Sequence, residues 1–186
     1  MNRAEIKALA KQQIKGNIGI LLVISIITGI ITGTGIGAIL LPGLSLSLCA
    51  IYLGLTNGEK PSIGAMFCRM SSLGKGWWLN ILTVFFVSLW SLLFYIPGIV
   101  KSIAYSMAPY ILADNPNLTA RQALTISKQI TKGHKWELFV LQLSFIGWHF
   151  VGMLTFGLAY IWIIPYMSTT TAHFYNYLKS QDYVGA

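Results

Sequence analysis

Residues 15–43 read KGNIGILLVISIITGIITGTGIGAILLPG: a Lys-Gly pair, a long apolar run, and a Pro-Gly pair that predicts a turn. A second apolar stretch follows this turn. The same order recurs from Lys75-Gly76 and from Lys132-Gly133, with turns predicted at Pro97-Gly98 and Phe156-Gly157. The sequence therefore predicts a single domain of three helical hairpins. The internal repeats cover about 4–56, 62–113 and 119–178.

The composition is that of an integral membrane protein. Hydrophobic residues make up 55% of the chain and charged residues 10%, and the mean hydropathy is +0.65, well outside the range of soluble domains. A helix needs roughly 20 apolar residues to cross a bilayer about 30 Å thick. Residues 17–41, 77–97 and 136–156 reach that length. We therefore expect an all-α membrane protein.

The three return segments are 43–55, 98–113 and 157–178, and the first two are short for a full crossing. Gly33, Gly35 and Gly37 leave open a first turn that lies earlier than Pro42, which would lengthen the second span. The first apolar run is longer than the core of a signal peptide and lacks an Ala-x-Ala exit, so we interpret it as a retained span.

The basic residues predict the orientation. All of the 13 lysines and arginines except Lys101 fall before, between or after the predicted hairpins. By the positive-inside rule these segments are cytoplasmic, which gives six spans with both termini inside. The net charge of +8 then reflects the orientation of the protein in the membrane. Nucleic-acid binding is not expected, because the chain carries no motif for it.

An amphipathic inner-surface helix is expected before each of the three hairpins, and the pattern is clearest before the first and the third. Ile6 and Ile14 in one, and Leu124 and Ile130 in the other, recur at helical spacing among polar residues, which is typical of helices on a membrane surface. For the helix before the third hairpin, Thr119 is a candidate N-cap and Gly133 a candidate C-terminal end. These helices either anchor the hairpins or offer a docking surface. The basic residues expected to contact lipid at the inner surface are Lys7, Lys11, Lys15, Arg69, Lys75, Arg121, Lys128 and Lys132.

A central cavity is a further hypothesis. Repeats that all begin and end inside are parallel, so a pseudo-threefold ring of hairpins can form. Proline in a spanning helix leaves a backbone carbonyl without its donor, which either builds a polar site at mid-depth or merely kinks the helix. Lys101 either snorkels to the outer interface or faces the interior. The candidate cavity residues are Tyr52, Lys101, Tyr105, Pro109, Tyr110, His149, Pro165 and Tyr166.

The sequence does not favour an enzyme. The acidic residues lie in or beside the inner-surface segments and form no pair at helical spacing, and no catalytic triad, metal-ligand cluster or phosphate-binding glycine loop is present. We therefore expect no catalytic residue, no metal and no cofactor. Cys49 lies in an apolar span and Cys68 in an inner segment, so a disulfide between them is not expected.

Several stretches carry a family resemblance: 105–116 (YSMAPYILADNP), 132–139 (KGHKWELF), 143–148 (LSFIGW) and 165–167 (PYM). Together they resemble the domain-of-unknown-function 975 family of bacterial integral membrane proteins. The resemblance extends over nearly the whole chain and is most specific in its central third. It implies a multi-pass protein of the bacterial cytoplasmic membrane, and it transfers no activity.

Two classes of function remain open. The first is non-catalytic binding or transport of a lipid or a hydrophobic peptide in a cavity between the hairpins. The second is an accessory or protective envelope protein, in stress or in peptide immunity, that acts through contacts with lipids or a partner membrane protein. A crevice that reaches mid-membrane favours the first class, and a solid core favours the second.

Overall fold

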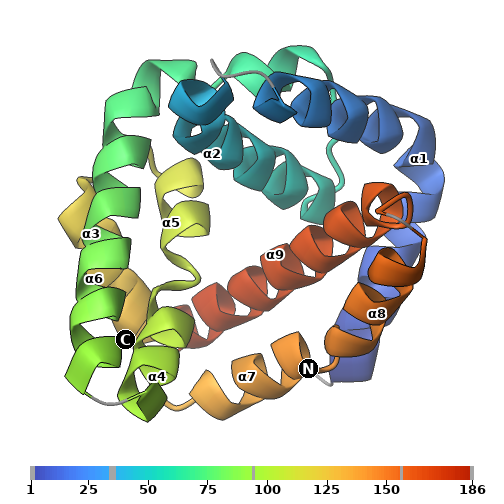
Figure 1. Ribbon diagram of the computed structural model, residues 1–186. Helices are drawn as coiled ribbons and strands as arrows, with labels where there is room; N and C mark the ends of the chain where they lie inside the picture. The colour runs from blue at the N-terminus through green and yellow to red at the C-terminus, as the bar shows by residue number, and fades with distance from the viewer. Residues whose placement is uncertain (1–2, 34–36, 94, 156, 185–186) are drawn as a thin grey trace.

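The computed structural model describes residues 3–33, 37–93, 95–155 and 157–184, and these residues are helical with no strand among them (Figure 1). In chain order the α-helices are α1 (Arg3–Gly33), α2 (Gly37–Thr56), α3 (Leu73–Leu93), α4 (Tyr95–Tyr105), α5 (Ala108–Asp114), α6 (Ala120–Ile130), α7 (Lys135–Leu143), α8 (Ile146–Leu154) and α9 (Tyr160–Val184). Two short 3₁₀ helices, η1 (Gly64–Phe67) and η2 (Met70–Ser72), lie between α2 and α3.

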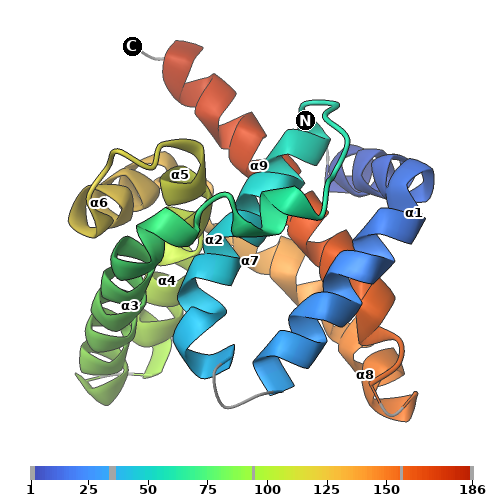
Figure 2. The same cartoon turned by 90° about the horizontal axis from the view of Figure 1, so that it is seen from above.

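The helices group by where they end. In Figure 2 the end of α1, the end of α3 and the end of α8 lie along the lower side, together with the beginnings of α2, α4 and α9. The C-terminal end of α9 and the helices α5 and α6 lie toward the other side. Helix α9 crosses the middle of the fold in Figure 1 and packs on α1 and α2, while α3 packs on α4 and α2 on α5. We call the lower side in Figure 2 the outer side and the opposite side the inner side.

Two of the three predicted turns are wrong in position. Helix α2 begins at Gly37 and contains Pro42, so the chain does not turn at Pro42-Gly43. Pro42 is the sixth residue of α2, so its missing N–H leaves the carbonyl four residues earlier without an intrahelical donor, yet the helix continues past it. The earlier turn that the glycines left open fits this helix, although residues 34–36 lie outside the described part. Pro97-Gly98 likewise falls within the first turn of α4. Gly157, with φ +89°, lies between α8 and α9 as predicted.

Two predicted spans are divided. The second return segment breaks where α4 ends at Tyr105 and α5 begins at Ala108. Pro109 then stands in the first turn of α5, where it breaks the helix rather than kinking it. The predicted span 136–156 is divided into α7 and α8 at Ser144 and Phe145.

The amphipathic segments have the predicted boundaries. Asn17 has non-helical angles (φ −128°, ψ 18°) and separates the first segment of α1 from its apolar remainder. Thr119 caps α6 through a capping box with Gln122, and Gly133, with φ +94°, follows the end of α6. The Thr119 and Gly133 predictions are therefore confirmed.

The apolar faces of these segments cover the protein instead of lying on lipid. Ile6 and Ile14 are each 1% exposed, and Ala123 is fully buried. Ser127 on the same face of α6 donates a hydrogen bond to the carbonyl of Ala104 at 2.7 Å. The amphipathic pattern was visible in the sequence, but the sequence did not show whether protein or lipid covers the apolar face. A helix packed on protein and a helix lying on lipid need the same apolar stripe.

Two described helical stretches are long and apolar enough to cross a membrane, Ala4–Gly33 and Lys135–Leu154. Leu40–Thr56 and Leu73–Leu89 are apolar but shorter. Six spans, the repeats and the orientation therefore stay predictions. Large apolar side chains are nevertheless exposed along the outer parts of the helices, for example Ile30, Phe85, Phe150, Leu154 and Leu158.

Candidate functional site

Two of the predicted cavity tyrosines meet at the centre of the fold, but they are packed. Tyr52 on α2 and Tyr110 on α5 are both buried. The hydroxyl of Tyr110 lies 3.3 Å from the carbonyl oxygen of Ser168 on α9, and its ring stacks on that of Tyr175 with centroids 6.2 Å apart. The return arms of all three predicted hairpins thus meet here. Neither Tyr52 nor Tyr110 lines any of the four pockets described below.

The remaining cavity candidates of the third hairpin lie between α8 and α9. The ring of Tyr166 makes edge contacts with Phe145 and Trp148, at centroid distances of 5.6 and 6.0 Å. His149 Nδ1 lies 3.3 Å from the Tyr160 hydroxyl. Pro165 is buried within α9. These contacts are packing contacts, and Tyr166 is packed against the same apolar core that contains Tyr52 and Tyr110.

Lys101 lies close to other cations. The charges of Lys128 and Lys135 act on it across the contact of α4 with α6 and α7. The sequence treated Lys101 as the exception to the charge rule because it counted residues from Pro97-Gly98. Helix α4 begins at Tyr95, so Lys101 lies six residues into this helix, further from the outer turn than the sequence placed it.

A groove runs between α6 and the pair α3–α4. It has a volume of about 450 Å³ and is lined by Phe86, Tyr105, Arg121, Leu124, Thr125 and Lys128. The four residues from α6 follow the i, i+3, i+4, i+7 spacing of one helix face. We call this the α6 groove.

The α6 groove combines positive charge with apolar walls. Neither Arg121 nor Lys128 has a side-chain hydrogen bond or ion pair within the part of the chain that the structure describes. The acidic residues nearest in sequence are engaged elsewhere: Asp114 with Lys179 at 2.6 Å, and Glu137 with His134 at 3.2 Å. Phe86 and Tyr105 contact each other on the opposite wall, with centroids 6.3 Å apart. Such a groove suits a molecule with an anionic head and an apolar tail.

A second groove lies at the start of α6. It has a volume of about 410 Å³ and is lined by Gly74, Lys75, Trp78, Thr119, Ala120 and Arg121. Lys75 Nζ donates a hydrogen bond of 2.5 Å to the carbonyl of Pro116, which holds its ammonium beside the loop before α6. We call this the Lys75 groove. Arg121 lines both grooves.

Two further pockets are smaller than the α6 groove and the Lys75 groove. One, of about 230 Å³, includes Glu59, Lys60 and Arg69 beside the end of α2. The backbone N–H of Arg69 donates to Ser47 Oγ at 3.2 Å, and its buried Nε has no partner among the described residues. The other, of about 190 Å³ between α2 and α3, includes Asn80 and Pro109.

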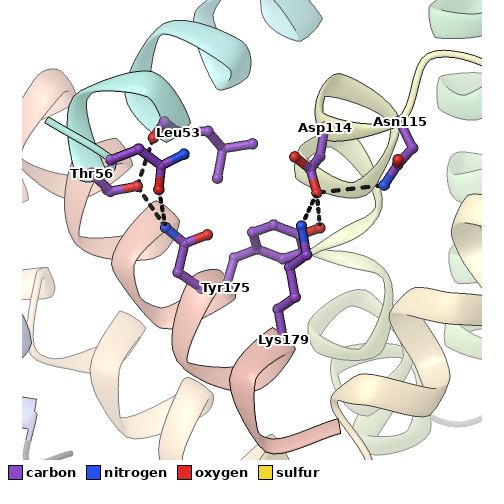
Figure 3. Close-up of polar contacts among 8 residues, drawn as sticks. Leu53, Thr56, Asp114, Asn115, Tyr175 and Lys179 are labelled. Atoms are coloured by element: carbon purple, nitrogen blue, oxygen red, sulfur yellow. Dashed lines mark hydrogen bonds and ion pairs between the residues drawn. The ribbon is translucent and has the colours of Figure 1, made fainter. Parts of the chain in front are cut away.

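A polar network joins the inner ends of the helices, and Figure 3 shows its two halves. The carboxylate of Asp114 accepts hydrogen bonds from Lys179 at 2.6 Å and from Tyr175 at 3.0 Å. Asn176 donates to the Thr56 hydroxyl at 2.7 Å. His173 Nε2 lies 2.7 Å from Oε1 of Gln13. The last turns of α9 are thereby tied to α1, α2 and α5, which the sequence did not predict because every pair is distant along the chain.

The other predicted lipid-contact residues are spread over the inner side. Lys7 Nζ donates to Ser144 Oγ at 2.6 Å and lies 4.8 Å from the centre of the Phe145 ring, so this cation is held against α7 and α8. Lys11, Lys15 and Lys132 are exposed. Among the described residues, no group of three or more histidine, cysteine or acidic side chains is placed to hold a metal ion.

The grooves themselves were not predicted. The sequence identified Arg121 and Lys128 as surface cations and Tyr105 as a cavity residue, but it did not place them together. One signal was available: Arg121, Leu124, Thr125 and Lys128 share one face of a capped helix. The missing wall, Phe86, belongs to α3 and is 35 residues before Arg121 in the sequence.

Comparisons with known proteins agree with the resemblance seen in the sequence. No curated protein and no solved structure matches the chain. Residues 94–182, which include α4 to α8 and most of α9, match a family described as "Protein of unknown function (DUF975)". Tyr105 and the α6 side of both grooves fall within this match. The part of the chain that builds α6 and its surroundings thus carries the sequence of the DUF975 family, as the resemblance predicted.

Proposed function

We propose that this protein is a multi-pass protein of the bacterial cytoplasmic membrane, with three hairpin repeats, six crossings and both ends inside. Three features support the proposal. Large apolar side chains are exposed on the outer parts of α1, α3, α8 and α9. Soluble monomers rarely expose apolar surface on this scale. The helix ends gather on the outer side while the basic helix α6 lies toward the inner side (Figure 2), as the positive-inside rule requires.

Within that setting the protein binds an anionic amphipathic molecule, a membrane lipid, at its inner side. The α6 groove carries this proposal, because it sets Arg121 and Lys128 beside the apolar wall of Phe86 and Leu124. A lipid phosphate accepts hydrogen bonds from both cations, and Arg offers it a planar pair of donors. Each basic residue near an anionic membrane surface contributes about 1 kcal/mol of attraction.

The wall of the groove continues onto surface that an acyl chain can follow. Ile81, Val84, Phe85 and Leu89 of α3 are exposed large apolar residues. Phe86 belongs to the same turn of α3 as Phe85, and the two rings contact each other at 5.6 Å. A lipid with its phosphate at Arg121 therefore has apolar protein beside its tail. A hydrophobic peptide uses such a surface less well, because its backbone hydrogen bonds would have no partners there.

Binding is favoured over transport. A transport route would have to pass the centre of the fold, where Tyr52 and Tyr110 are buried and Tyr110 stacks on Tyr175. A packed centre of this kind is what the sequence associated with an accessory role. The lipid then acts as a bound partner of the protein rather than as its cargo.

An accessory or protective role in the envelope is the second candidate, and one observation favours it. The polar face of α6 carries Gln122 and Gln129, and Lys132 follows the end of the helix; all three are exposed and outside the α6 groove. A partner membrane protein can dock on this face while lipid fills the groove. Both candidates are non-catalytic.

Native mass spectrometry of the protein released gently from its own membrane tests the binding proposal. We expect a retained anionic lipid, and we expect the double variant R121Q/K128Q to lose it. The matched control is K11Q/K15Q, which removes the same charge from exposed inner-side residues that line neither groove. Equal lipid retention by both double variants, or retention of a protein subunit and no lipid by the wild type, would contradict lipid binding at the α6 groove.

The topology has a separate test. Cys68 is exposed and predicted to be inside, while Leu158 is exposed next to the third outer turn. In a C49A background, a membrane-impermeant maleimide should label Cys68 only after the cells are permeabilised. In a C49A/C68A background, L158C should be labelled in intact cells. The reverse pattern would overturn the proposed orientation.

A further inference from the structure

Arg121 is the point from which this inference starts, because it belongs to two grooves. On one side it lines the α6 groove with Lys128, and on the other it lines the Lys75 groove with Lys75. Arg121 and Lys128 are two helical turns apart on α6, which is about 10 Å along the axis. Each groove thus has a cation of its own, and the two share a third.

Each groove also has its own apolar wall. Phe86 and Leu124 line the α6 groove, and Trp78 lines the Lys75 groove. Trp78 and Phe85 are exposed on α3, which runs past both grooves. Tryptophan at the level of the headgroups is typical of membrane interfaces. Both grooves are therefore built for a phosphate with a tail rather than for a free phosphate.

The positive charge is concentrated around this pair of grooves. Lys128 and Lys135 both lie near enough to Lys101 for their charges to act on it. The two grooves themselves are lined by three cations, Lys75, Arg121 and Lys128. A single phosphodiester carries one negative charge, so it compensates only part of the charge that lines the grooves. A ligand with two linked phosphates compensates more of it, because the second phosphate reaches its groove without a second binding event.

We infer that the two grooves together bind one lipid that carries two phosphates, of the diphosphatidylglycerol (cardiolipin) type, with one phosphate between Arg121 and Lys128 and the other between Arg121 and Lys75. This inference rests on the proposed function and names its ligand. Basic pockets between helices on the inner side of a membrane are the general setting in which such lipids are recognised.

The full-length protein in detergent, given equal lipid phosphate as phosphatidylglycerol or as cardiolipin, provides the test by native mass spectrometry. We expect cardiolipin to be retained at least about tenfold better per molecule, with one bound per protein. K75Q should lower cardiolipin retention about fivefold and leave phosphatidylglycerol retention unchanged. K128Q should lower the retention of both lipids. K11Q is the control and should change neither.

The variant K75R separates a binding role of Lys75 from its hydrogen bond to Pro116, because arginine keeps the charge. Cardiolipin preference retained in K75R and lost in K75Q supports the inference. Equal retention of the two lipids, or an equal loss of both in K75Q, overturns the inference while lipid binding at the α6 groove stands. Retention of neither lipid by the wild type overturns the inference and the proposed function together.

Discussion

The inner and outer parts of this protein are stabilised differently. On the inner side, Ile6, Ile14 and Phe174 are almost completely buried, and the polar network of α9 joins helices from all three predicted hairpins. On the outer side, Phe150 is 62% exposed and Leu154 is 81% exposed. Protein covers the inner part, whereas the chain leaves large apolar side chains of the outer part uncovered. The free energy of unfolding should therefore respond to substitutions on the inner side and tolerate equal substitutions on the outer side.

The largest effect should come from a buried ring. Phe174→Ala should lower the free energy of unfolding by about 3 kcal/mol, because it removes a buried aromatic side chain and leaves a cavity. Phe150→Ala makes the same chemical change at an exposed position and should cost less than about 0.5 kcal/mol in a mild detergent. Unfolding of both variants in denaturing detergent, followed by circular dichroism, measures the two costs. Similar losses in both would remove the distinction between the two parts.

A close approach of α3 to α2 should give the next effect. A Cβ at Gly76 would lie 2.9 Å from the carbonyl oxygen of Pro42. Gly76→Val should therefore lower the free energy of unfolding by about 2 kcal/mol, since backbone must move to make room. Gly147→Val is the matched control, because Gly147 also lies in the first turn of a helix and nothing lies within 4 Å of its Cβ position. Equal thermal stability of the two variants would show that α2 and α3 can move apart at Gly76 at little cost.

The polar network should contribute less than the apolar core. Asp114→Asn removes the charge that Lys179 and Tyr175 share. The Asp114 and Lys179 side chains are 29% and 41% exposed, so solvent screens the pair. We expect a loss of about 1 kcal/mol. Glu137→Gln tests the more exposed pair with His134 and should cost less. If Glu137→Gln proves the more damaging, the network of α9 does not hold the inner part together.

The smallest effect should come from the cap of α6. Thr119→Ala removes the side chain of the capping box and should cost about 0.5 kcal/mol, the lower end for such a change. Thr125→Ala on the same helix removes a hydroxyl that bonds only to the carbonyl of Arg121 within the helix, so it should be nearly neutral. Hydrogen exchange of the first amides of α6 sharpens the comparison. Faster exchange in Thr125→Ala than in Thr119→Ala would mean that the capping box does not stabilise the first turn of α6.

The sequence predicted local features of the fold well. The helix cap at Thr119, the stop at Gly133 and the turn at Gly157 are confirmed, because each depends on the backbone preferences of one or two residues. The turns at Pro42 and Pro97 were placed a few residues late. A Pro-Gly pair ends a helix in many contexts, but it also occurs in the first turn of a helix, as at Pro97 in α4, and here inside one, as at Pro42 in α2.

The sequence identified single residues of the grooves but not the grooves themselves. Arg121, Lys128, Lys75 and Tyr105 were each identified by residue type and place, but the grooves depend on how α3, α4 and α6 pack. That packing follows from Ser127 and Ala123 fitting against α4 and α5, which no local pattern encodes. Tyr52 and Tyr110 were predicted to face a cavity, and both are buried in the core. Whether tyrosines at that place surround space or fill it depends on side-chain volumes across three helices.

The network at the end of α9 has a consequence for biosynthesis. Residues 173–179 supply the contacts with α1, α2 and α5, and they are synthesised after all three of these helices. Helices α1, α2 and α5 are therefore complete well before their inner ends can be joined. A nascent chain that stops before His173 leaves Gln13, Thr56 and Asp114 without these partners, and quality-control proteases that recognise loosely joined helices can act until this segment emerges.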